Sequence, residues 1–146
     1  MTPEAIAPLV AQSKIFSLLD GDGQRRLAQI AKEVRFSPGT VVMHEGEEGQ
    51  AFFLLLTGML RVEAADYTES NRHVATLMPG AVFGEIAALT GEPRTATITA
   101  AAESVALEFE IVGVFNLLKD YPQALAELKR LGVQRSEDLL AKMNEE

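Results

Sequence analysis

Apolar residues near the start of the chain recur at helical spacing. Residues 3–12 predict a short helix or turn, whose regularity is limited by Pro8. A second helix is predicted from Gln24 to Val34, because its apolar residues share one helical face. The first 34 residues are therefore expected to form an N-terminal helical segment. The apolar residues of the second helix are Leu27, Ile30, Ala31 and Val34.

The run Asp20-Gly21-Asp22-Gly23 precedes this helix and has two interpretations. A calcium-binding loop would need a bidentate glutamate at its twelfth position, and the twelfth residue counted from Asp20 is Ala31. The sequence therefore favours a turn in which Asp22 caps the helix that follows.

Between Arg35 and Glu110 the pattern changes to short apolar runs separated by glycine and proline turns. Many short strands with regular turns are typical of a β-barrel or jelly roll. The polar stretch 66–72 is expected to be a hairpin loop within this part. The predicted strands are residues 41–43, 51–56, 59–64, 73–78, 95–99 and 104–109.

The C-terminal part of the chain returns to helical spacing. Residues 112–119 begin a helix that the pair Tyr121-Pro122 breaks, and a last helix is predicted from Pro122 to about Met143. Gly132 lies within this last helix, where glycine costs about 1 kcal/mol relative to alanine, and is a candidate hinge. The apolar stripe of the last helix consists of Leu125, Leu128, Leu131 and Leu139.

Composition limits the possible classes of protein. The 146 residues are enough for one domain with a substantial core, and we expect a single domain over 1–146. The absence of cysteine excludes disulfides and thiolate metal ligands. The net charge of −8 argues against nucleic acid or an anionic membrane as a direct partner. Since no apolar run suits membrane insertion and no secretory signal is recognisable, a cytoplasmic location is expected.

Residues 79–100, PGAVFGEIAALTGEPRTATITA, combine the features of an anion-binding site. Gly84 lets a ligand approach the backbone, and the N–H groups of a helix start just after it would favour an anion. Arg94 adds a permanently charged guanidinium suited to phosphate. Glu85 is unfavourable beside an anion unless it accepts hydrogen bonds from vicinal hydroxyls, as on a ribose. The stretch therefore predicts a nucleotide site, and a β-turn with a structural Glu85–Arg94 ion pair is the alternative.

This stretch resembles the phosphate-binding cassette of cyclic-nucleotide-binding domains, whose pattern is roughly F-G-E-[IL]-A-x-L-x-x-x-P-R-[STA]-A. The run from Phe36 to Val62 resembles the same family, so the resemblance covers about residues 13–145. Every fixed position of the cassette is present: Phe83, Gly84, Glu85, Ile86, Ala87, Leu89, Pro93, Arg94, Thr95 and Ala96.

The resemblance implies a mainly β fold with flanking helices (α+β). We expect an eight-stranded β-barrel or jelly roll with N-terminal helices, a short phosphate-binding helix and a C-terminal lid helix. The barrel would occupy residues 35–110 with the cassette at 79–100, and the hinge and lid helices would occupy residues 111–146.

The resemblance also implies roles for cassette residues. Arg94 would pair with the cyclic phosphate, which would also accept hydrogen bonds from the backbone N–H groups of Ala87 and Thr95. Glu85 and the Gly84 N–H would hold the ribose 2′-hydroxyl. The other cassette residues expected at the ligand are Phe83, Ile86 and Ala96.

The base would rest on Val62 and Val74 in the barrel, with the final helix closing over it as a lid. Arg135 on that helix would stack on the purine, unless it is only a solvated charge. The hydroxyl of Thr95 can contact the 2-amino group of a syn guanine. Both cAMP and cGMP are therefore candidate ligands, and we favour cAMP while expecting measurable cGMP binding.

The implied function is that of a sensor, in which the ligand shifts the population toward the lid-closed state. We expect no catalytic residue and no metal or cofactor besides the ligand. The output would pass to an effector domain or partner protein, or through a homodimer formed by the C-terminal helix.

Two other classes of function are alternatives. A scaffold that had lost its ligand would leave Glu85 and Arg94 free to vary, and the intact pair argues against it. A cupin-type enzyme or a phosphodiesterase would need a metal cluster. His44 and His73 are the only histidines and lack the HxH spacing, so no enzyme is expected.

Overall fold

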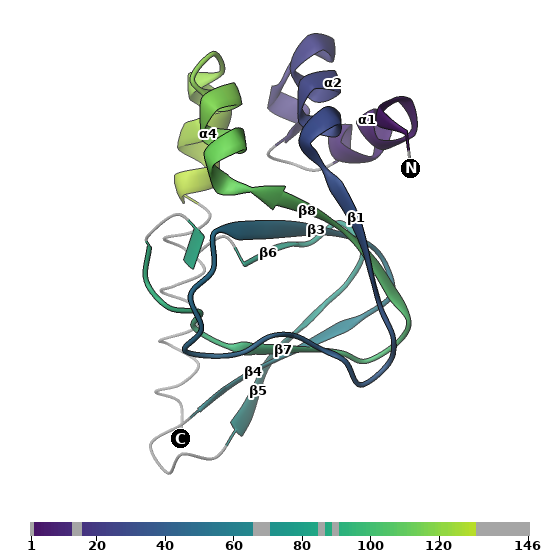
Figure 1. Ribbon diagram of the computed structural model, residues 1–146, viewed down its shortest axis with the longest axis vertical. Coiled ribbons are helices and arrows are strands. Elements are labelled where there is room, and N and C mark those ends of the chain that lie inside the picture. The colour runs from purple at the N-terminus through teal and green to yellow at the C-terminus, as the bar shows by residue number, and fades with distance from the viewer. Residues whose placement is uncertain (1, 13–15, 66–70, 85–86, 89–90, 131–146) are drawn as a thin grey trace.

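Two four-stranded antiparallel sheets form the β part of the chain, and helices gather at one end of it (Figure 1). The computed structural model describes residues 2–12, 16–65, 71–84, 87–88 and 91–130. The first sheet has the strand order β1-β8-β3-β6 and the second has β2-β7-β4-β5. The strands are β1 (Lys32–Phe36), β2 (Val41–Met43), β3 (Ala51–Thr57), β4 (Leu60–Ala65), β5 (Asn71–Leu77), β6 (Val82–Phe83), β7 (Thr97–Ala100) and β8 (Ser104–Glu110).

The described helices cover the outer face of the first sheet, while the second sheet lies on the side away from them (Figure 1). Two of the helices begin with a side-chain cap. The Thr2 hydroxyl accepts a hydrogen bond from the Ala5 N–H at the start of α1, and the Asp20 carboxylate accepts one from the Gly23 N–H at the start of α2. The helices are α1 (Pro3–Ala11), the 3-10 turn η1 (Phe16–Leu18), α2 (Gly21–Ile30), α4 (Ile111–Leu118) and the helical residues 122–130.

Strand β3 is buried on both faces. Its successive side chains point in opposite directions, and each face packs into one of the two core clusters. Phe52 and Leu54 face the helices, where Phe52 packs with Phe16 and Phe109 at ring-centroid distances of 6.1 and 5.3 Å. The alternate residues of β3 face the second sheet. Together the two faces make β3 the strand that both cores share.

The core between the two sheets is built from shorter side chains and one aromatic pair. Phe53 of β3 stacks on Phe83 of β6 with a centroid distance of 5.0 Å. Burial of each such side chain contributes about 1.5–3 kcal/mol. The buried members of this cluster are Met43, Phe53, Leu55, Leu60, Leu77, Phe83, Ile98, Ala100 and Ala106.

The sequence prediction of the second helix was wrong at both ends. Helix α2 begins at Gly21 with Asp20 as its cap, instead of Asp22, and it ends at Ile30. Residues 32–36 form β1, so the N-terminal helical segment does not extend to residue 34. Ala31 is already extended, and β1 pairs residue by residue with β8, including Val34 with Ala106. This non-local pairing overrides the helical spacing of Val34.

The other strand predictions were confirmed to within two residues where the structure describes them, and the α+β class with eight strands was confirmed. Residues 112–119 are helical as predicted, since α4 covers 111–118, and the last helix is confirmed for residues 122–130. Its continuation to Met143, with Gly132, lies outside the described residues. The hairpin tip at 66–70 also lies outside them.

Candidate functional site

The cassette stretch includes β6, β7 and the segment that connects them. Gly80 and Gly84 have φ angles of 98° and 81°, in the left-handed region that favours glycine. Residues 87 and 88 are helical, and the Ala88 N–H is 3.4 Å from the Gly84 carbonyl oxygen. The chain therefore turns sharply at Gly84, as the sequence predicts.

Arg94 is buried, with only 8% of its surface exposed. Its Nη1 donates to the Gly84 carbonyl oxygen at 2.8 Å, and its Nη2 donates to the Ala51 carbonyl oxygen at 3.0 Å. The guanidinium thus joins the cassette to the start of β3. Because guanidinium remains charged at any ordinary pH, this is a permanent positive charge held inside the protein.

The main chain of Arg94 is also held, by the loop between β2 and β3. The Arg94 N–H donates to the Glu47 carbonyl oxygen at 2.6 Å, and the Gly46 N–H donates to the Arg94 carbonyl oxygen at 2.8 Å. In the same loop, the N–H of Glu45 donates to the Thr97 hydroxyl at 3.0 Å. These contacts fix the position from which the Arg94 side chain extends.

The structure also describes four other predicted ligand residues of the cassette, and their exposed fractions differ. Ala87 and Ala96 are buried at 2% and 7% exposure, and Thr95 is half-buried. Phe83 is 1% exposed and stacks on Phe53 in the core between the sheets. This packing accounts for Phe83 without a ligand contact, and its contact with a ligand stays a prediction.

The two residues predicted to support the base lie on adjacent strands of the second sheet. Val62 of β4 pairs with Ala75 of β5 and packs against the core between the sheets. The pairing shifts after Val62, since Glu63 pairs with His73, so Val74 stands at a β-bulge. A bulge changes the direction of a side chain, and the contact of Val74 with the base stays a prediction.

Three predicted ligand residues lie outside the described residues: Glu85 and Ile86 in the cassette, and Arg135 on the last helix. Their predicted roles therefore stay predictions. His44 is exposed on the loop before Glu45.

A second polar cluster, which the sequence analysis did not predict, joins α2 to the start of the helical residues 122–130. The Tyr121 hydroxyl donates to the Asp20 carboxylate at 2.7 Å, and Arg26 pairs with Asp120 at 3.2 Å. The hydrogen bonds from the Gly23 N–H and from Tyr121 lower the pKa of Asp20, and the Asp20 carboxylate raises the pKa of Tyr121. The sequence indicated Tyr121 only as a helix breaker.

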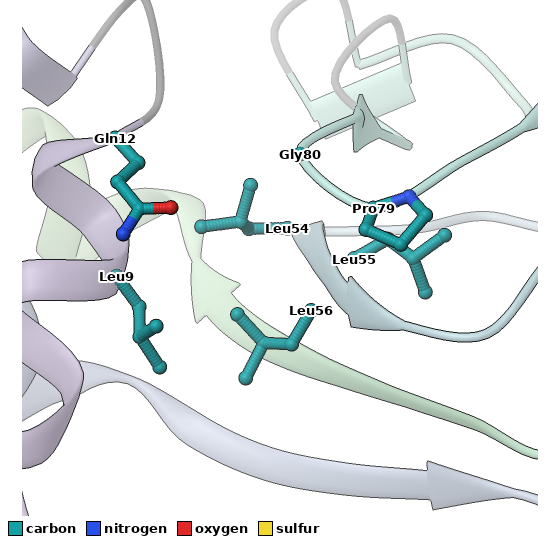
Figure 2. A pocket seen from close by; sticks show the side chains of 7 residues that line it. All are labelled: Leu9, Gln12, Leu54, Leu55, Leu56, Pro79 and Gly80. Atoms are coloured by element: carbon teal, nitrogen blue, oxygen red, sulfur yellow. The ribbon is translucent and has the colours of Figure 1, made fainter.

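The structure also contains a groove between the end of α1 and β3 (Figure 2). Its volume is about 300 Å³, and Leu9 and Gln12 extend into it opposite Leu54 and Leu56, with Pro79 at its rim (Figure 2). Its described lining contains none of the predicted ligand residues. We therefore do not assign the nucleotide to this groove.

Within the described residues, no group of three or more histidine, aspartate or glutamate side chains could hold a metal ion. A search of the same residues for a helix of membrane-spanning length and hydropathy finds none.

Comparison with protein families assigns most of the chain to one family. Residues 33–121 match the family of the cyclic nucleotide-binding domain. The matched range includes both sheets except for Lys32, together with residues 79–100 and α4. The chain belongs to the cyclic nucleotide-binding domain family.

Relatives place similar sequences within larger signalling proteins. The chain is 25% identical over 136 residues to a cAMP-dependent protein kinase regulatory subunit from Candida albicans. It is 29% identical over 130 residues to a cyclic nucleotide-gated potassium channel from Rhizobium etli. These matches cover 88% and 87% of this chain but only 28% and 34% of the relatives. The chain thus spans between a quarter and about a third of these relatives' length.

A solved structure with the same fold is the regulatory subunit of a cAMP-independent protein kinase A from Trypanosoma brucei. The TM-score is 0.82 at 23% identity, covering 89% of this chain and 47% of that one. At this identity the likeness concerns the fold, and the ligand has to be argued from the residues of the site.

Proposed function

We propose that the chain binds a cyclic nucleotide, with the cyclic phosphate at Arg94 and at the backbone N–H groups of Ala87 and Thr95. The observation that carries this proposal is the burial of the Arg94 guanidinium beside the turn at Gly84. A buried positive charge is stabilised by an anion that approaches it, and a guanidinium suits the geometry of phosphate oxygens. The family to which the chain belongs supports the same ligand class.

The ribose and the base complete the proposed ligand. Glu85 would accept a hydrogen bond from the ribose 2′-hydroxyl, which gives an acidic side chain a favourable role next to an anion. Val62, which packs against the core between the sheets, would support the base together with Val74. The Thr95 hydroxyl follows Arg94 directly and is the residue by which cGMP would be distinguished from cAMP.

Calorimetric titration of nucleotide-free protein tests this proposal. We expect binding of cAMP and of cGMP at micromolar dissociation constants or tighter, which corresponds to about −8 kcal/mol or better. Adenosine and guanosine, which lack the phosphate, should bind at least about tenfold more weakly if the buried arginine supplies a charge-assisted contact. Equal affinity for nucleoside and cyclic nucleotide, or no binding of either nucleotide, would contradict the proposal.

The nucleosides are informative because the similar fold in Trypanosoma brucei belongs to a kinase described as cAMP-independent. A fold of this kind therefore does not by itself guarantee a response to cAMP. Arg94 is the residue in this chain that would make the phosphate necessary.

We further propose that the C-terminal helix acts as a lid over the bound nucleotide. The start of this helix is anchored, since Ala124 and Leu128 are buried against the helices and the first sheet. The bound ligand would then change the position of the part of this helix that follows its anchored start. Hydrogen exchange should slow in the last helix when the nucleotide binds, and Arg135→Ala should weaken binding less than Arg94→Ala. Unchanged exchange and unchanged titration in Arg135→Ala would leave Arg135 as a surface charge.

The proposed output is regulation of an effector domain or partner protein, as the names of the relatives suggest for kinases and channels. The apolar stripe of the last helix is an alternative contact between two copies. Light scattering with and without nucleotide distinguishes a homodimer from a monomer. No catalytic step is proposed.

A further inference from the structure

Gly49 is in direct contact with the guanidinium of Arg94. A side-chain Cβ built on Gly49 would overlap Cζ, Nε and Nη2 of Arg94. The guanidinium therefore lies against the bare backbone of Gly49, in the volume that any other residue would fill with its own side chain.

The backbone at Gly49 does not itself require glycine. Its φ angle lies outside the left-handed region, in contrast to that of Gly84 at 81°. The turn between β2 and β3 is made at Gly46, where φ is 88° and where an added Cβ would meet nothing within 4 Å. Among these three glycines, Gly49 alone combines an ordinary φ angle with an overlap on Arg94, so its smallness matters for the arginine rather than for the turn.

We propose that Gly49 is a positioning residue for the phosphate site. The proposal rests on the proposed function, since the phosphate is the ligand that Arg94 would bind. The missing Cβ lets the guanidinium lie close enough to donate to the carbonyl oxygens of Gly84 and Ala51, at 2.8 and 3.0 Å. These two acceptors belong to different parts of the chain and bond different nitrogens, so they fix the orientation of the planar group. The Arg94 guanidinium is thereby oriented before the anion binds, and less binding free energy is lost in ordering it.

Gly49→Ala isolates this effect. The atoms that an alanine Cβ would displace belong to the end of a flexible side chain, so the backbone can keep its conformation while the guanidinium moves. The fold should survive, and the orientation of Arg94 should not. Gly21→Ala is the matched control, because Gly21 also has an ordinary φ angle and an added Cβ there meets nothing within 4 Å.

The experiment is a double-mutant cycle between Gly49→Ala and Arg94→Ala, read by titration with cAMP and with adenosine and by thermal melting. We expect Gly49→Ala to weaken cAMP binding about tenfold, which equals about 1.4 kcal/mol, because a contact to a charged group is lost or misaligned. Adenosine affinity should change less than about threefold, since no phosphate is involved. In the Arg94→Ala background, Gly49→Ala should have no further effect on either reading.

Three results would overturn the proposal. An equal loss for cAMP and adenosine would show a general distortion of the site, as would an undiminished effect of Gly49→Ala in the Arg94→Ala background. Wild-type affinity for cAMP in Gly49→Ala would show that the phosphate does not need this placement of the guanidinium.

Failure of the proposed function has a different signature. A wild-type chain that binds neither cAMP nor cGMP rejects the nucleotide, and with it the phosphate role of Gly49. The melting cycle needs no ligand and still decides whether Gly49 positions Arg94: coupling between the two substitutions confirms the contact, and additivity rejects it.

Discussion

The region around Arg94 and the region around Tyr121 both join distant parts of the chain, but they do so by different means. Arg94 is buried and interacts with main-chain groups 10 and 43 residues away, at Gly84 and Ala51. Tyr121 is half-buried, and its hydroxyl reaches the exposed side chain of Asp20, 101 residues away, at the protein surface. The carbonyl oxygens that accept from Arg94 are present whatever residues stand at positions 84 and 51. The hydrogen bond between Tyr121 and Asp20 exists only if both of these side chains are kept.

The comparison indicates how each region is stabilised. Beside Tyr121, the apolar side chains of Leu118 and Leu128 are fully buried in the core next to the helices. Exposed ion pairs and hydrogen bonds contribute little in comparison with such burial. The helix junction is therefore held by packing with polar contacts at its edge, while the candidate site is held by hydrogen bonds to a buried charge.

Removing the buried charge should have the largest effect. We expect Arg94→Ala to weaken cAMP binding by at least about 2 kcal/mol, or roughly 30-fold, because the phosphate loses its charged donor. Calorimetric titration measures the change. Arg35→Ala, which removes an exposed arginine on β1, is the control and should leave affinity unchanged. Near-wild-type affinity in Arg94→Ala would refute the assignment of the cassette.

The polar edge of the helix junction should matter less. Tyr121→Phe removes the hydroxyl that donates to Asp20 and keeps the ring that packs against the core. We expect the melting temperature to fall by about 1–3 °C, with little change in nucleotide affinity. A fall of more than about 8 °C would show that this hydrogen bond, and not the packing, holds the junction.

The same contact should give stability a dependence on acidic pH. The pKa of Asp20 is lowered from its ordinary value of 3.8 by the Gly23 N–H and the Tyr121 hydroxyl. Since the folded pKa lies below the unfolded one, the stabilisation is present above the unfolded value and is lost as pH falls through the folded value. Melting curves from neutral pH to about pH 3 should show the wild-type advantage over Asp20→Asn narrowing below about pH 4. An advantage independent of pH would contradict this.

The smallest effect is expected at the exposed ion pair between Arg26 and Asp120, whose side chains are 39% and 66% exposed. Arg26→Gln should change the melting temperature by no more than about 1 °C, and the difference should shrink as salt is added. Arg25→Gln, at the exposed neighbouring position, is the control. A large and salt-independent loss in Arg26→Gln alone would show that the pair is more than a surface contact.

Local patterns were sufficient to predict much of the fold. The unbroken apolar run of β3 and the glycine turns around it give its position to within a residue. Val34 is the instructive failure, because its spacing from Leu27 and Ile30 fits a helix equally well. Its strand conformation depends on pairing with Ala106, 72 positions later, and no local spacing contains that information.

The sequence predicts one part of the candidate site and misses another, as it does for the fold. The cassette motif predicts Arg94 as the charged residue, because the motif is contiguous in sequence. It does not predict that Gly49 and the Ala51 carbonyl lie against the guanidinium, since the loop that brings them there is more than 40 residues earlier. The Asp20–Tyr121 contact escaped prediction for the same reason, as each residue has a sufficient local explanation on its own.

The double burial of β3 has a consequence for dividing this chain. A fragment containing only the strands, residues 32–110, would place the helix-facing side of the first sheet in water. Phe52, Leu54, Leu107 and Phe109 lie on that side and are now almost completely covered. A continuous apolar surface of this kind promotes aggregation. We therefore expect the strands to need these helices to fold, since the helices cover this apolar face.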